Sequence, residues 1–153
     1  MRGRSFDGQC LAGEAFIGAD LYRATFRGAH LEGAVFVGCF AAEAVFTGAH
    51  CAGLAARGSN FYRADFRQAK LSDALFWQCV LAGADLRGAS LRGITLTLDC
   101  NTFEETQMDR AASAELAYLF GRAHSPHRPG WWEVVGSADL PRLERVFASQ
   151  GGL

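Results

Sequence analysis

A period of five residues runs through roughly the first two thirds of this chain. Counting in fives from Phe6 meets a large apolar side chain at most steps, and the residue two places earlier is mostly small, usually Ala. The positions at this spacing are Phe6, Leu11, Phe16, Leu21, Phe26, Leu31, Phe36, Ala41, Phe46, Cys51, Ala56, Phe61, Phe66, Leu71, Phe76, Leu81, Leu86, Leu91 and Leu96. Five matches neither the helical period of 3.6 nor the strand period of 2. A fixed internal period overrides local patterns, so residues 6–96 are predicted to fold as a repeat architecture.

The repeated unit resembles that of the pentapeptide-repeat family, which reads roughly Ala-Asp/Asn-Leu-x-x. The closest matches are Ala19-Asp20-Leu21, Ser59-Asn60-Phe61, Ala64-Asp65-Phe66 and Ala84-Asp85-Leu86. The resemblance covers about residues 2–98. It implies a mainly β fold, a right-handed four-sided β-helix of about five coils with one pentapeptide per side. Residues 20 apart would then stack vertically.

Sorting the repeat centres into four columns, at intervals of 20 residues, tests that geometry. Phe dominates the first and third columns and Leu the second and fourth, and rings stacked at the strand spacing of about 4.8 Å can pack in offset fashion. The third coil is irregular, because Cys51 and Ala56 are small while Leu54 takes a place that is otherwise small. Packed cores tolerate voids poorly, so we expect a local distortion there.

The repeats stop after Leu96, and we assign residues 1–98 to the β-helix and residues 99–153 to a helical capping or dimerisation segment. Thr102-Phe103-Glu104-Glu105 resembles a capping box that starts a helix to about residue 122. A second helix is expected from about Asp139 to about Ser149. Since a solenoid needs protected ends, these helices either cap the β-helix or join two copies into a homodimer, or do both. The candidate interface residues are Phe120, Trp131, Trp132, Leu143 and Phe147.

The residues flanking each centre should point outward and carry the function, because the interior is filled by side chains. On the third and fourth sides these residues are mostly apolar, which predicts an interaction surface with aromatic anchors. Two interpretations remain open: an external protein binds there, or the C-terminal segment of the chain folds back over the surface. The candidate residues are Ile17, Val35, Val37, Leu75, Trp77, Tyr22, Phe40 and Tyr62.

The remaining sides give little support for chemistry. The first side alternates Asp and Arg, which is typical of a solvated face with ion pairs. The second side aligns Cys10, His30 and His50, but three ligands in a line do not make a tetrahedron, so we assign no metal site. No nucleotide fingerprint or nucleophile set is present, and a filled β-helix offers no substrate cavity. The sequence predicts a non-enzymatic protein with no catalytic residue and no cofactor.

These observations predict a protein-interaction or scaffold module in a bacterial cytoplasm, with a protein partner of unknown identity. No apolar run approaches the ~18 residues of a membrane span. The five Cys form no disulfide framework, which indicates a reducing compartment. A third reading, a metal-binding or enzymatic protein, rests on the Cys and His residues alone.

The family resemblance implies one alternative partner, a DNA topoisomerase such as gyrase, bound through imitation of duplex DNA in antibiotic or toxin protection. That mimicry implies a strongly acidic surface. Residues 1–98 instead contain ten Lys and Arg residues against eight Asp and Glu residues. Direct nucleic-acid binding is not expected either, because no basic face of one sign appears.

Overall fold

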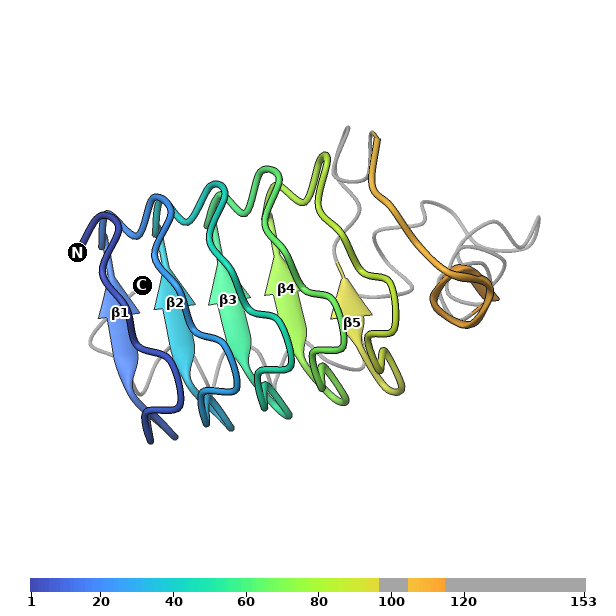
Figure 1. Cartoon of the computed structure of the whole chain (residues 1–153), viewed down its shortest axis with the longest axis horizontal. Helices are drawn as coiled ribbons and strands as arrows, with labels where there is room; N and C mark the ends of the chain where they lie inside the picture. Colours follow the sequence, from blue (N-terminus) through green and yellow to red (C-terminus); the bar gives the residue numbers. More distant parts are fainter. Residues whose placement is uncertain (97–104, 115–153) are drawn as a thin grey trace, which may run out of the picture.

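The computed structural model describes residues 1–96 and 105–114 (Figure 1). Five short parallel strands follow one another in chain order in a single sheet. Each strand pairs with the strand 20 residues further on, so that Phe16 lies opposite Phe36. The strands are β1 (Ala15–Ile17), β2 (Val35–Val37), β3 (Ala55–Arg57), β4 (Leu75–Trp77) and β5 (Thr95–Leu96). Figure 1 shows the chain making one circuit between each strand and the next.

The sheet is one wall of four, and the other three walls are built from isolated parallel bridges in the same register. We name the four sides by their first centres: Phe6 for the first side, Leu11 for the second, Phe16 for the third and Leu21 for the fourth. The first side runs through Ser5, Thr25, Val45, Asp65 and Asp85, the second through Cys10, His30, His50, Lys70 and Ser90, and the fourth through Asp20, Phe40, Asn60 and Val80. The predicted four-sided β-helix is therefore confirmed.

Stacked aromatic rings fill the interior. The rings of Phe6, Phe26, Phe46 and Phe66 follow one another at centroid separations of 4.8, 4.9 and 4.7 Å and lie within 9° of parallel. Rings from the third side meet this column edge-on, as Phe36 does at 6.2 Å from Phe26. The predicted packing of one coil on the next is confirmed, and the aromatic column ties the coils into one core.

The predicted distortion of the third coil is wrong. Ala56 pairs in unbroken register with Phe36 on one side and Phe76 on the other. Two larger side chains supply the missing volume. Leu54 is buried, and Phe61 reaches across from the fourth side to ring-centroid distances of 6.1 Å from Phe36 and 5.8 Å from Phe76. Leu54 and Phe61 therefore pack where Ala56 is small, and the coil keeps its register.

The Cys side chains in the core are free thiols that act as small buried residues. Cys39, Cys51 and Cys79 are all buried, whereas Cys10 is exposed. Burial raises the pKa of the Cys51 thiol to about 12. Because the thiolate is the reactive form, this residue is held in its unreactive state.

Residues 105–114 pack at the C-terminal end of the solenoid. Gln107 forms a parallel bridge with Asp85, and its carbonyl accepts a hydrogen bond of 2.8 Å from the amide of Leu86. Ala112 is buried in the core, and Met108 packs against the same cluster. This part of the chain therefore continues the first side beyond the last coil.

The helix begins later than predicted. Residues 110–114 are helical, and the side chain of Asp109 caps them by accepting a 2.9 Å hydrogen bond from the amide of Ala112. The expected helix start at the Thr102 capping box is wrong, because residues 106–109 are held in non-helical conformation by pairing with the last coil. The second predicted helix lies outside the described residues. So do the interface candidates Phe120, Trp131, Trp132, Leu143 and Phe147.

Among residues 1–96 and 105–114, no helix has the length and apolar character that crossing a membrane requires.

Candidate protein-interaction surface

The outer face of the third side is buried along much of its length. On β2, Phe36 points into the core, so Val35 and Val37 point outward, yet they are only 4% and 7% exposed. They form a second apolar cluster with Ala55 and Leu75, separate from the core inside the β-helix. Val35, Val37 and Leu75 are therefore buried, and their part in an interaction surface stays a prediction.

The two ends of the third side differ from its middle. Ile17 on β1 occupies the same position as Val37 one coil on, and it is 59% exposed. Trp77 on β4 is half-buried, and its ring lies 5.0 Å from the guanidinium carbon of Arg57. The outward face of the third side is therefore buried on β2, half-buried at Trp77 on β4 and exposed at Ile17 on β1.

The fourth side presents three large apolar residues that remain accessible. Phe40, Tyr62 and Val80 are 42%, 37% and 41% exposed, and all three lie on this wall. Tyr22 is half-buried, and its ring stacks on Phe40 at a centroid distance of 5.9 Å. Of the predicted surface residues, Phe40 and Tyr62 lie on this open wall together with Tyr22. Val80 extends the wall toward the C-terminal end.

Charged corner residues lie beside these rings. The guanidinium of Arg23 lies 4.9 Å from the Tyr22 ring centroid, and that of Arg63 lies 5.1 Å from the Tyr62 ring centroid. Arg23 Nε also donates a 2.7 Å hydrogen bond to Glu43. This bond holds the pKa of the Glu43 carboxyl below its usual value. The resulting surface combines flat aromatic area with fixed cationic groups.

These corner residues adopt a backbone conformation that usually belongs to Gly. Arg23, Glu43 and Arg63 have φ values of 57°, 56° and 53°, whereas the last corner of this side is Gly83. At the equivalent corner of the first side, Gly28 has φ 60°, and the space that a side chain would enter there is open. Side chains other than Gly in this region carry a strain of about 1 kcal/mol or more. Three corners of the fourth side carry this strain, and each bears a long charged side chain near the rings.

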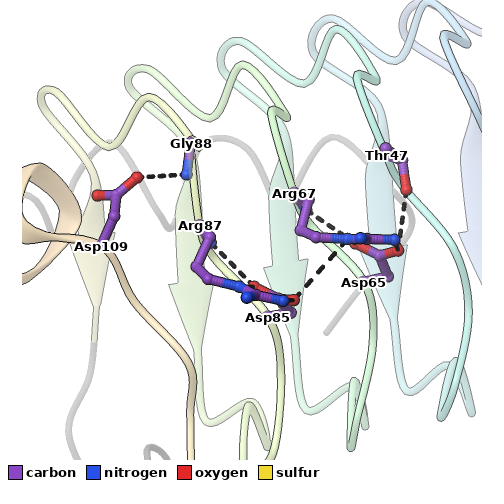
Figure 2. Close-up of polar contacts among 7 residues, drawn as sticks. All are labelled: Thr47, Asp65, Arg67, Asp85, Arg87, Gly88 and Asp109. Carbon is purple, nitrogen blue, oxygen red and sulfur yellow. Dashed lines mark hydrogen bonds and ion pairs between the residues drawn. The ribbon is translucent and has the colours of Figure 1, made fainter.

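The charged side chains of the first side pair with one another (Figure 2). Arg67 pairs with Asp65 at 2.7 Å and approaches Asp85 in the next coil at 3.8 Å, while Arg87 pairs with Asp85. Hydrogen bonding to Arg87 holds the pKa of the Asp85 carboxyl below its usual value. The ladder continues to Asp109, which accepts a hydrogen bond from the Gly88 amide. The predicted alternating charges are thus paired with one another and leave no face of one sign.

The repeats match a sequence model of one family. The model described as pentapeptide repeats, in eight copies, matches residues 5–36, 26–61 and 59–97. The chain belongs to the pentapeptide-repeat family. A comparison with curated proteins finds no match.

Solved structures of other pentapeptide-repeat proteins are similar to this chain in fold. QnrB1, a plasmid-mediated fluoroquinolone resistance protein, is 19% identical with a TM-score of 0.40, and the match covers 76% of this chain and 83% of that one. A pentapeptide repeat protein from the Arabidopsis thaliana thylakoid lumen is 20% identical with a TM-score of 0.41 and 88% coverage of both chains. Rfr23 from the cyanobacterium Cyanothece 51142 is 20% identical with a TM-score of 0.37, covering 71% of this chain and 86% of that chain. These likenesses concern the fold alone.

The sequence places Arg23 and Arg63 near the corner of the fourth side, but sequence reasoning missed Glu43. Arg23, Glu43 and Arg63 are 20 residues apart and occupy a place that is Gly at most other corners of this pentapeptide-repeat protein. That departure from the repeat is visible in the sequence. It would have marked the fourth side as distinct.

Proposed function

We propose that this pentapeptide-repeat protein is a non-enzymatic protein-interaction module that binds its partner through the fourth side of the β-helix. The observation that carries the proposal is the gathering of Phe40, Tyr62 and Val80, each more than a third exposed, on one wall. Apolar surface gathered in this way usually marks an interface. The buried thiols favour a reducing compartment such as the cytoplasm.

The chemistry of the wall suits a protein rather than a nucleic acid. Tyr, Phe and Arg are enriched in protein interfaces and supply most of their hot spots. Arg23 is paired with Glu43, and Arg2 with Asp20 at 3.0 Å, so the wall is not a basic stripe that would follow a phosphate backbone. The backbone bridges between coils also hold the rings in place, which reduces the ordering cost of binding.

Replacing Phe40 with Glu is expected to weaken partner capture at least tenfold, because a desolvated carboxylate at an interface centre costs more than the 1.4 kcal/mol that corresponds to a factor of about ten. The measurement is affinity capture from lysate of the source organism, quantified for Phe40→Glu and for wild type. Ala52→Glu is the matched control, since Ala52 is exposed on the opposite, second side and the charge change is the same. Equal capture by all three proteins, or loss in both variants, would contradict the proposal.

The C-terminal segment, residues 99–153, is proposed to cap the β-helix and to cover the third side. Burial of Ala112 and the packing of Met108 on the core support the capping role. Burial of Val35 and Leu75 on an outward face supports the covering role. The same segment is a candidate to join two copies of the chain into a homodimer, and sedimentation analysis distinguishes a monomer from a dimer.

Topoisomerase binding by DNA mimicry is the alternative, and the charge of the surface opposes it. The acidic residues of the first side are neutralised by Arg67 and Arg87. The repeat region carries more Lys and Arg than Asp and Glu. A gyrase supercoiling assay separates the two functions, because an interaction module of the kind proposed leaves supercoiling unchanged at stoichiometric excess.

A further inference from the structure

On the second side, His30 and His50 occupy the same position in consecutive coils. A parallel bridge joins the two residues, and their rings lie 4.6 Å apart at a tilt of 39°. The sequence pattern showed only a vertical line of Cys10, His30 and His50. The structure adds Glu32, which lies two residues after His30 and reaches toward both rings.

The carboxylate of Glu32 converges on the two imidazoles. Its Oε1 atom lies 3.3 Å from Nδ1 of His30 and 3.7 Å from Nδ1 of His50. One ligand atom from each of the three residues falls within 4.8 Å of the others. A tetrahedral zinc ion with bonds of about 2.0–2.2 Å to nitrogen and oxygen separates neighbouring ligand atoms by ~3.3 Å. The observed spacing therefore requires only small side-chain rotations to surround an ion.

The β-helix fixes the starting points of these side chains. The amide of His50 donates a 2.9 Å hydrogen bond to the carbonyl of Ala29, and the carbonyl of His50 accepts a 2.8 Å bond from the amide of Leu31. The two imidazoles are thus held by a ladder that does not depend on any ion. The side chains of His30, Glu32 and His50 are 50%, 41% and 34% exposed, so an ion reaches them from solvent.

We propose that His30, Glu32 and His50 form a surface binding site for a divalent transition-metal ion of the zinc class. Two imidazoles and one carboxylate suit zinc, copper and nickel, whereas magnesium and calcium prefer all-oxygen sites. Three protein ligands leave a position for water or for a donor from another molecule, as in open zinc sites. The site lies on the wall opposite the fourth side, so it is independent of the proposed docking surface.

In the absence of an ion, one hydrogen bond joins the group, from an imidazole N–H of His30 to Glu32. Binding of the ion through that nitrogen replaces this bond, because a ligating nitrogen must give up its proton. The competition lowers the affinity for the ion but leaves the geometry intact. The proposal therefore concerns a site that binds zinc added to the folded protein and that the fold does not need.

The test is zinc titration of the full chain after chelator treatment, with the thiols kept reduced and affinity measured by calorimetry. The wild type is expected to bind about one zinc ion at this site. His50→Ala and Glu32→Gln should each weaken that binding about tenfold or more, since even outer partners of metal ligands contribute 10–100-fold. Glu14→Gln is the matched control: it makes the same change at an exposed Glu outside the group and should leave the affinity unchanged.

A second readout locates the ion directly. One equivalent of zinc should shift the imidazole NMR resonances of His30 and His50, and it should raise the melting temperature of the wild type but not of His50→Ala. These ligands are on the surface, so the variants should melt with the wild type when no zinc is present. Absence of zinc binding to the wild type would overturn the proposal. Equally tight binding to His50→Ala and Glu32→Gln, or unshifted His30 and His50 resonances, would do the same.

Discussion

Replacing Phe46 with Ala should lower the free energy of unfolding by about 3–5 kcal/mol. Phe46 is fully buried in the third coil, and its ring stacks between Phe26 at 4.9 Å and Phe66 at 4.7 Å. It also meets Phe36 and Phe61 edge-on at 6.1 and 6.0 Å. Its neighbours are held by backbone bridges on every side, so they cannot collapse into the void, and the cavity cost adds to the lost burial.

Denaturant unfolding of the wild type and the variant measures this loss. Phe40→Ala is the control, because it removes the same side chain from an exposed position on the fourth side and should cost no more than about 1 kcal/mol. A solenoid is stabilised by contacts between neighbouring coils, so a cavity in the third coil uncouples the two halves. Equal losses for Phe46→Ala and Phe40→Ala would contradict the stacked core as the main source of stability.

Replacing Val37 with Asp should cost about 3 kcal/mol or more, whereas the same change at Ile17 should cost about 0.5 kcal/mol or less. The two residues are register partners on β1 and β2 and point outward from the same side. They differ in environment, since Val37 is 7% exposed and Ile17 is 59% exposed. A carboxylate at Val37 loses its hydration in this buried position, and the buried Val surface is lost as well.

Thermal and denaturant unfolding of both variants provide the comparison. A large difference between them would support burial of the outward face of the third side at β2. If Val37→Asp were as mild as Ile17→Asp, the third side would be open to solvent. The accessible apolar surface would then extend from the fourth side onto the third.

The period of five predicted the fold well because the same side-chain contacts recur between each coil and the next. Once Phe6 stacks on Phe26 in the 20-residue register, the same contact recurs at Phe46 and Phe66. The third coil was mispredicted because the sequence shows which residues are small but not which distant side chain fills the gap. Phe61 fills it from another wall.

The surface was harder to predict than the core. Strand alternation shows that Val35 and Val37 point outward, but it carries no information on what lies over them. The helix start shifted to residue 110 because pairing of Gln107 with the last coil overrides the local capping signal. Sequence reasoning missed Glu32 because its approach to His50 in the next coil depends on the direction of the Glu32 side chain. The order of residues along one side does not show that direction.

Site-specific photo-crosslinking in cells of the source organism tests the proposed docking surface most directly. A photoreactive phenylalanine derivative is placed at residue 40 or residue 62 on the fourth side, and at residue 52 on the opposite wall. We predict one protein crosslinked from residues 40 and 62 and none from residue 52. A partner crosslinked from residue 52 but not from residues 40 and 62 would contradict binding through the fourth side.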